Sequence, residues 1–421
     1  MKSPKKPKAE FKDYFKSLGP GLITGASDDD PSGIATYSQA GAGFGLATLW
    51  TAWITFPLMA AIQEMCARIG LVTSSGLTNV IKKHYSKKLL YVMLALSFPA
   101  ITLNIGADIA GMGSVSNLLF PSIPSFVFSI LFTFLLMYII IQYSYKKLAA
   151  ILKWLCVVLF LYIIVPFLVT KDWGIVLKNA FIPTIQFNRE FCEILVAILG
   201  TTISPYLFFW QTNMEAESQA QTETHIVVNK FFLNKMRSDV ITGMFFSNIV
   251  MFFIMLTTGV VLFNGGIHKI DTVEQAAQAL RPLAGDLSYV LFAIGVIGTG
   301  LLAIPVLAGS LSYILAETFD WKEGLDKKFN EAKGFYITVI ISLLIGLFIN
   351  FTKITAFDAL FVTAIVYGIT SPVLIGVILH ICNNKKIMGN ETNGMLANGL
   401  GIITFVLMAA AAITLIYFQF K

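Results

Sequence analysis

Long apolar stretches separated by short polar intervals dominate the chain from residue 19 onward. Each apolar stretch runs for roughly 18 to 30 residues, the length of a helix that crosses a bilayer. The stretches do not alternate in the ten-residue pattern of barrel strands, so we expect an all-α membrane protein. The pattern predicts eleven spans, at 19–43, 46–70, 89–112, 123–143, 147–169, 190–211, 237–263, 286–316, 333–351, 354–382 and 395–419.

The composition supports lipid as the main solvent of this chain. Hydrophobic residues make up 56% of the 421 residues and charged residues only 13%, about half the charged share of a soluble domain. The net charge of +6 does not indicate a nucleic-acid partner, because the lysines are spread over short loops. Loop lysines of this kind orient a membrane protein.

The distribution of positive residues predicts the orientation. With residues 1–18 as a cytoplasmic tail, lysines and arginines in the inside segments outnumber those outside by about three to one. We therefore expect a cytoplasmic N-terminus, an outside C-terminus and an inner (cytoplasmic) membrane location. No cleavable signal peptide is evident. Surface helices are expected within 213–235 and 272–282.

The sequence carries no sign of catalysis. It has no HExxH motif, no phosphate-binding glycine loop and no CxxC pair among its four cysteines. We expect no enzyme activity and no cofactor. We expect no ATPase domain and no ATPase subunit, so any activity that needs energy would draw on an ion or substrate gradient. The expected partners are the lipid bilayer and a small solute.

The first and sixth spans are interrupted in the middle. Pro31 follows three aspartates in span one, and Pro205 follows Ser204 in span six. Proline removes a backbone donor and clashes with the preceding turn, while Gly33 and Gly200 lower the cost of leaving helical geometry. Two ordinary proline kinks would be the simpler reading. Matched positions five spans apart favour two broken helices around a substrate site.

Three consecutive aspartates at membrane depth require a function or a partner, since each charge is costly there. Asp30 directly precedes Pro31, so we expect it to face the central cavity as a cation ligand. Asp28 and Asp29 point in other directions around the helix. They could cap backbone groups, face a water-filled vestibule or supplement the site.

These residues resemble the NRAMP (natural resistance-associated macrophage protein) divalent-metal transporters. The similarity rests on Gly19-Pro-Gly21, on Asp30-Pro-Ser-Gly-Ile-Ala-Thr36 and on the Gln63-to-Thr73 segment of span two. The resemblance implies a LeuT-type fold with two inverted five-helix repeats, 19–169 and 190–382, and an eleventh helix at 395–419. It also implies a central cation site between spans one and six.

The chain departs from that family at the site itself, which suggests a divergent branch. The family motif Asp-Pro-Gly-Asn is here Asp30-Pro-Ser-Gly33, and the span-six methionine is Ser204. The ligands that remain are Asp30, Thr201, Ser204 and main-chain carbonyls near Ala26 or Ser27, with Gly33 at the asparagine position. These hard oxygens suit Mg²⁺, Mn²⁺ or Ca²⁺ and select weakly among transition metals.

Proton coupling is expected to be weak. Tyr206 and Gln211 occupy the positions of family histidines, and Gly111 replaces a family glutamate. Asp108 resembles a family carboxylate, and a coupling role or a structural role remains equally open. Asp28 and Asp29 are further candidates for coupling or gating. Glu64 and Arg68, four residues apart, could form a structural pair or a cytoplasmic gate.

The sequence thus predicts a secondary transporter that moves a divalent cation by alternating access. The alternative is a transporter of the same fold whose site accepts a non-metal solute, such as an organic cation or an amino acid, because half-helix dipoles and an aspartate also suit an ammonium group.

Overall fold

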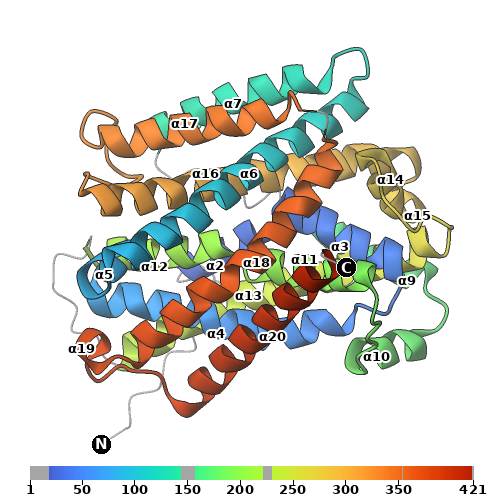
Figure 1. Ribbon diagram of the computed structural model, residues 1–421. Coiled ribbons are helices and arrows are strands. Elements are labelled where there is room, and N and C mark those ends of the chain that lie inside the picture. The colour runs from blue at the N-terminus through green and yellow to red at the C-terminus, as the bar shows by residue number, and fades with distance from the viewer. Residues whose placement is uncertain (1–18, 144–156, 221–229, 353, 420–421) are drawn as a thin grey trace, which may run out of the picture.

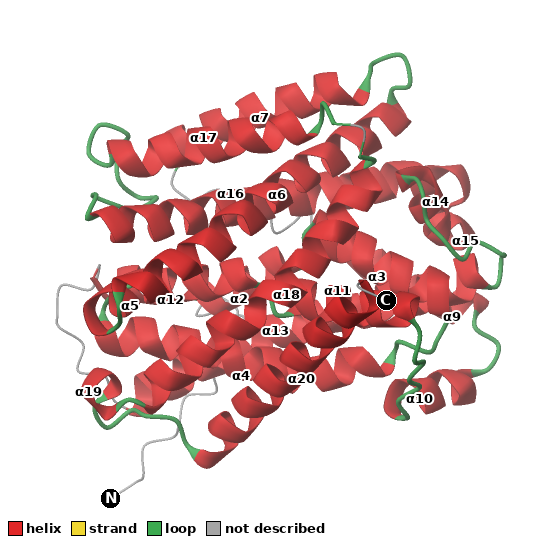
Figure 2. Cartoon of the chain, in the orientation of Figure 1, coloured by secondary structure: helices red, strands yellow, loops and turns green. Residues whose placement is uncertain are grey.

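The computed structural model describes residues 19–143, 157–220, 230–352 and 354–419. Across these residues the chain is helical, and the elements drawn in Figure 2 are helices joined by loops. The helices of the first half are α2 (Pro20–Asp28), α3 (Pro31–Phe44), α4 (Trp50–Thr73), α5 (Leu77–His84), α6 (Lys87–Leu119), α7 (Ser125–Gln142), α9 (Leu161–Val169) and α10 (Trp173–Phe181). The helices of the second half are α11 (Arg189–Thr202), α12 (Pro205–Ala220), α13 (Lys230–Thr258), α14 (Val273–Ala277), α15 (Arg281–Ala284), α16 (Ser288–Phe319), α17 (Lys333–Ile349), α18 (Ala356–Asn383), α19 (Lys385–Met388) and α20 (Met395–Gln419).

The chain is a multi-pass membrane protein. Within the described residues, 7 helical stretches are long and apolar enough to cross a bilayer, and α17 is a shorter apolar helix. Neither half of the pair α2–α3 reaches that length, because the helix stops at Asp28 and resumes at Pro31. Many large apolar side chains lie exposed on the outer helices, for example Phe134 on α7 and Phe348 on α17, as lipid contact requires.

The polar intervals differ in part from expectation. Residues 213–220 continue α12 and 230–235 open α13, so the expected separate helix over 213–235 is wrong for its described part. The helix expected within 272–282 is present as α14, a 3₁₀ turn and α15. Of the fifth predicted span, only residues 157–169 lie within the described chain. Helices α5, α10 and α19 were not expected.

The broken helices lie at the centre of the bundle. Helix α13 packs along both α2 and α3, and α18 packs against α11, α3 and α6. In Figure 1, α7 and α17 form the outer layer beside α6 and α16, whereas α11 and α18 cross near α3. The interruptions are therefore enclosed by other helices, the condition under which irregular backbone is tolerated at membrane depth.

Glycines bring the broken helices into backbone contact with their neighbours. A Cβ added at Gly25 of α2 would lie 2.3 Å from the carbonyl oxygen of Gly243 on α13. A Cβ at Gly200 of α11 would lie 2.0 Å from the carbonyl oxygen of Ala364 on α18. Such contacts between small residues are typical of helix packing in membranes. They fix each broken helix before any ligand is considered.

Candidate functional site

The first interruption places an aspartate at the start of a half-helix. Asp29 and Asp30 lie outside helical geometry, and Asp30 has an extended backbone with φ −69° and ψ 171°. Its Oδ1 accepts a hydrogen bond from the backbone N–H of Gly33 at 2.7 Å, so Asp30 is the N-cap of α3. Pro31 occupies the first helical position, where the missing N–H would have no partner. The local sequence therefore accounts for this break.

The second interruption leaves two residues, Ile203 and Ser204, between α11 and α12. The Ser204 hydroxyl donates to main-chain carbonyls of the last turn of α11, with 3.2 Å to that of Gly200. The Ile203 carbonyl accepts from the Ser371 hydroxyl of α18 at 3.1 Å. Gly200 itself lies within α11, one turn before the break, where it packs on α18.

The two interruptions lie against each other. Tyr206 of α12 donates its hydroxyl hydrogen to the Ser27 carbonyl of α2 at 2.8 Å. A Cβ added at Gly33 would lie 3.5 Å from Thr201 Oγ1, 3.5 Å from Asp30 Oδ1 and 3.3 Å from the Asp28 carbonyl oxygen. The structure thus brings Asp30, Gly33 and Thr201 together around one point, bordered by carbonyl oxygens of the last turn of α2.

Asp30 has a further partner that the sequence reasoning missed. The side-chain amide of Asn104, on α6, donates to Asp30 Oδ2 at 2.9 Å. Asp108 follows one turn later on the same helix, and its carboxylate lies near the backbone N–H of Ser32 but accepts no hydrogen bond of full geometry. Asn104 and Asp108 are fully buried. The sequence shows only that Asn104 lies four residues before Asp108, on the same face of one helix, and does not show which neighbouring helix that face meets.

The neighbouring aspartates share one donor on α13. The Ser247 hydroxyl lies 2.9 Å from Asp28 Oδ2 and 3.3 Å from Asp29 Oδ1, and Asp28 Oδ1 has no partner. Asp28 is 0% exposed, Asp29 5% and Asp30 2%. None of the ion pairs found among the described residues includes these three aspartates. Buried carboxylates without a cationic side chain attract a cation to this point.

A polar line leads from the break along α2 and α12. The Gln211 amide donates to Glu215 Oε1 at 3.0 Å, and the Thr24 hydroxyl donates to Gln211 Oε1 at 2.5 Å. At the start of α2, Asp239 of α13 accepts from the backbone N–H groups of Gly19 and Gly21 at 2.9 and 2.7 Å. Glu215 and Asp239 border a cavity of about 240 Å³. The sequence analysis did not identify Glu215 and Asp239 as neighbours, because only the packing of α12 against the start of α2 and α13 brings them to one cavity.

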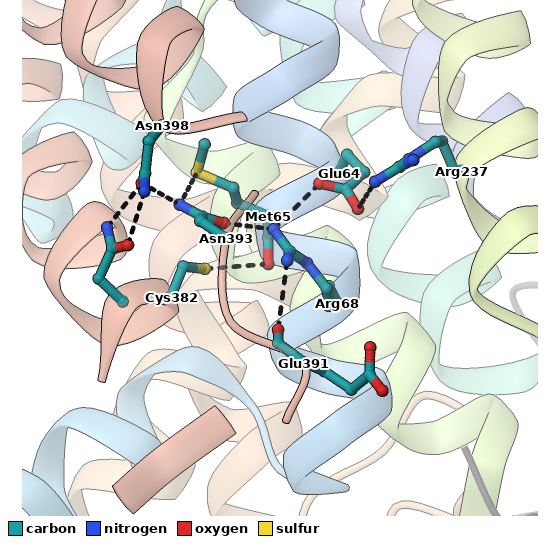
Figure 3. A network of polar contacts seen from close by, with 9 residues as sticks. Glu64, Met65, Arg68, Arg237, Cys382, Glu391, Asn393 and Asn398 are labelled. Carbon is teal, nitrogen blue, oxygen red and sulfur yellow. Dashed lines mark hydrogen bonds and ion pairs between the residues drawn. The ribbon is translucent and has the colours of Figure 1, made fainter. Parts of the chain in front are cut away.

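Glu64 and Arg68 form a larger network than a helix-face pair (Figure 3). The guanidinium of Arg68 donates to Glu64 Oε2 at 3.2 Å, to the Glu391 carbonyl at 3.2 Å and to Asn393 Oδ1. Arg237 of α13 donates to Glu64 Oε1 at 3.3 Å. The network therefore joins α4 to α13 and to the link between α18 and α20.

The donors at the two breaks are oxygens. The Asp28 carbonyl, Asp30 Oδ1 and Thr201 Oγ1 lie within 3.5 Å of a Cβ added at Gly33, whereas the Ser204 hydroxyl bonds to carbonyls of its own helix. Among the described residues, no three His, Cys, Asp or Glu side chains converge in an arrangement that could hold a metal ion. A cation here would depend on one or two carboxylates and several neutral oxygens, with water completing its shell, as hard cations accept.

Sequence comparison supports the resemblance over nearly the whole chain. The family model described as "Natural resistance-associated macrophage protein-like" (Nramp) matches residues 21–418. The divalent metal cation transporter MntH of Caldanaerobacter subterraneus subsp. tengcongensis is 24% identical over 405 residues, covering 94% of this chain and 91% of that protein. MntH of Mesorhizobium japonicum is 23% identical over 423 residues, covering 97% and 89%.

Solved structures share the fold. The manganese transporter of Eremococcus coleocola, in complex with an aromatic bis-isothiourea substituted compound, superposes with a TM-score of 0.78 at 18% identity, covering 99% of this chain and 89% of that one. MhsT in complex with L-phenylalanine gives 0.63 at 14% identity, covering 95% and 98%. Mhp1, a nucleobase-cation-symport-1 family transporter, gives 0.56 at 12% identity, covering 95% and 90%. The predicted LeuT-type fold is confirmed by these likenesses.

Proposed function

The chain belongs to the Nramp family, and we propose that it is a secondary transporter that carries a divalent cation across the cytoplasmic membrane by alternating access. The relatives reported above are transporters of divalent metal or manganese by name, which supports this substrate class. A gradient of the cation or of a coupled ion would supply the energy. Transport rather than catalysis is the activity of this family.

Asp30 is the observation that carries the proposal. Its carboxylate lies between two half-helices, at the N-terminus of α3 and beside the last turn of α2. The C-terminal end of a helix carries partial negative charge on its free carbonyls, so α2 adds to the attraction that Asp30 exerts on a cation. The ligands we assign are Asp30, Thr201, Ser204 and the Ser27 carbonyl.

The identity of the donors supports a preference for hard cations. Gly33 contributes no side chain where the family motif has an asparagine, and Ser204 contributes a hydroxyl where it has a methionine. We infer a site for Mg²⁺, Mn²⁺ or Ca²⁺ with weak discrimination among transition metals. Tyr206 and Gln211 are not titratable near neutral pH, which supports weak proton coupling.

The proposed orientation follows the lysine and arginine distribution. The N-terminus would lie in the cytoplasm and the C-terminus outside, in a bacterial inner membrane. In this orientation the network of Glu64, Arg68 and Arg237 lies on the cytoplasmic side, because it sits toward the C-terminal end of α4, the second span. Cysteine labelling from each side of the membrane at exposed loop positions tests this assignment.

Uptake into proteoliposomes is the decisive test of the function. We expect saturable uptake of Mg²⁺, Mn²⁺ or Ca²⁺ by the full chain, and its loss in Asp30→Ala. Asp286→Asn, in the exposed turn between α15 and α16, is the matched control and should transport normally. Vesicles in which Asp30→Ala takes up metal as fast as the natural chain would refute the assignment of this site.

The same assay addresses the alternative substrate. The chain shares its fold with MhsT, whose structure holds L-phenylalanine, so an amine or an amino acid is the alternative solute. Vesicles that are inert to all three metals but bind an organic amine through Asp30 would establish that alternative. A pH-sensitive dye inside the vesicles tests coupling; we expect no acidification of the lumen during metal uptake.

A further inference from the structure

Asn104 stands opposite Asp30 at a position that no comparison assigns to the site. Its side-chain nitrogen lies 2.9 Å from Asp30 Oδ2, and the residue is fully buried on α6. The other carboxylate oxygen of Asp30 accepts from the Gly33 N–H. Both oxygens of the proposed cation ligand are therefore hydrogen-bonded, and the Asn104 amide occupies one direction from which a cation would bind.

The amide oxygen of Asn104 has no hydrogen-bond partner, although it is buried. A buried acceptor without a partner destabilises the folded state, which indicates that this oxygen has a partner when the site is loaded. Two further unsatisfied groups lie on the same side of the site. One is the carboxylate of Asp108, one turn later on α6. The other is the hydroxyl of Tyr367 on α18, which packs against α6 and lies next to the Asn104 amide.

A half-turn of the Asn104 side-chain amide would give these buried oxygens partners when a cation is present. The amide oxygen would then face the cation on Asp30, and the amide nitrogen would turn toward the side of Asp108 and Tyr367, which have unused acceptor capacity. The rotation gives up the bond to Asp30 Oδ2 and keeps the Asn104 amide next to the Tyr367 hydroxyl.

We propose that Asn104 is a ligand of the transported divalent cation, which supplies from α6 the amide oxygen that Gly33 cannot supply from α3. In the empty site Asn104 donates to Asp30, and in the loaded site it accepts the cation. The inference rests on the proposed function and deepens it. With Asn104 as a ligand, α6 contributes to the cation site together with the half-helices that carry Asp30 and Thr201. Helix α6 also packs against α16, α17 and α7.

Binding of Mg²⁺ and of Mn²⁺ to the purified full chain, measured by titration calorimetry, tests the role. We expect Asn104→Leu to weaken binding by about tenfold or more, which corresponds to the loss of one ligand contact. Asn104→Asp keeps an acceptor and loses the donor, so it should bind at least as tightly as the natural chain. Asn117→Leu, on the same helix and bonded only to the Ile123 carbonyl, is the control.

The pair of variants separates a ligand from a residue that merely holds Asp30 in place. Binding by Asn104→Asp that is as weak as binding by Asn104→Leu overturns the proposal, because an oxygen at this position would then contribute nothing to the cation. Unchanged affinity in Asn104→Leu overturns it equally.

A rescue experiment provides an independent readout. Adding Gly33→Asn to Asn104→Leu returns an amide to the other side of Asp30 and should restore most of the affinity; no restoration counts against an amide-ligand role. If Asn104→Leu fails to fold, the comparison of Asn104→Asp with Asn117→Leu decides alone. Failure of the natural chain to bind any divalent ion would reject the proposed function itself, and is distinct from failure of the variants.

Discussion

The hydroxyl of Tyr206 donates to the carbonyl oxygen of Ser27 across 2.8 Å, so the second half of one broken helix holds the last turn of the other. Tyr206 is fully buried, and its ring lies 5.8 Å from that of Tyr367 on α18. The bond fixes a carbonyl that we assign to the cation site. It also connects α2 with α12, so the two interruptions form one structural unit.

Removing this bond should loosen the site. We expect Tyr206→Phe to lower the free energy of unfolding by about 1 kcal/mol, the usual net value of a buried hydrogen bond. Cation uptake should slow as well, because the Ser27 carbonyl is no longer held. Thermal unfolding in detergent and initial uptake rates in proteoliposomes measure the two effects.

Tyr162→Phe is the matched control for that variant. The Tyr162 hydroxyl is buried without a partner, so its removal should leave stability unchanged or raise it. Equal losses of stability in Tyr162→Phe and Tyr206→Phe would show that the bond to Ser27 contributes nothing of its own.

The preference for hard cations should be reversible. A side chain at position 33 would begin within 3.5 Å of Asp30 Oδ1 and Thr201 Oγ1. Gly33→Asn combined with Ser204→Met therefore introduces an amide oxygen and a soft thioether at the break, and thioethers favour later transition metals. We expect the affinity for Mn²⁺ relative to Mg²⁺ to rise by about tenfold, roughly 1.4 kcal/mol, in competition calorimetry.

A control separates selectivity from general damage to the site. Ser38→Ala, on the same half-helix as Gly33, removes a buried hydroxyl that has no partner. It should leave the ratio of Mn²⁺ to Mg²⁺ affinity unchanged. A double variant with the ratio of the natural chain would mean that position 33 does not face the cation.

The general fold could be predicted because membrane burial dominates the sequence. The lengths of the apolar stretches predicted most of the spans. Pro31 and Pro205 predicted the two interruptions that the structure shows. The prediction of a surface helix within 213–235 was wrong for the described residues, because mixed polarity is typical both of a surface helix and of the ends of two long helices. There, α12 continues on Thr212 and Asn213, whose side chains bond back to their own helix.

The partners of the site residues were beyond reach from sequence. Asn104 is separated from Asp30 by 74 residues and Asp239 from Gly21 by 218, and neither pair has a spacing rule. Periodicity places a residue on a face of its own helix but does not select the neighbouring helix. Asp30 was accessible to prediction because its role depends on local features, the proline after it and the N–H groups of the following turn.

The network in Figure 3 should be a major source of stability. Glu64 and Arg68 have side chains only 8% and 6% exposed, and Glu64 also receives Arg237. In Glu64→Gln two guanidinium groups lose their carboxylate, and Arg68 stays buried. Breaking one side of a buried pair typically costs several kcal/mol, and because Arg68 keeps its bonds to Asn393 and to the Glu391 carbonyl we expect about 2 kcal/mol.

An exposed pair of the same spacing provides the comparison. Arg189 and Glu193 are also four residues apart, but their side chains are 54% and 27% exposed. Glu193→Gln should cost well under 1 kcal/mol, as exposed pairs usually do. Denaturant unfolding of both variants tests the difference, and similar losses would show that burial does not strengthen the Glu64 network.

The loop between α16 and α17 should respond to pH through Glu323. Burial, and next the negative charge of Glu217, raises the pKa of Glu323 to about 7, while Lys327 opposes the shift. The folded loop therefore holds this proton more tightly than the unfolded chain does. Its stabilising contribution is complete below the ordinary glutamate pKa of about 4.3 and is lost as the pH rises through about 7. Between pH 6 and pH 8 we expect a loss of about 1 kcal/mol.

Amide hydrogen exchange of residues 320–332, corrected for intrinsic rates, should thus be faster at pH 8, and Glu323→Gln should abolish the difference. Glu331→Gln, at an exposed position of the same loop, should retain it. Equal protection of the natural loop at both pH values would mean that Glu323 ionises as an ordinary surface glutamate.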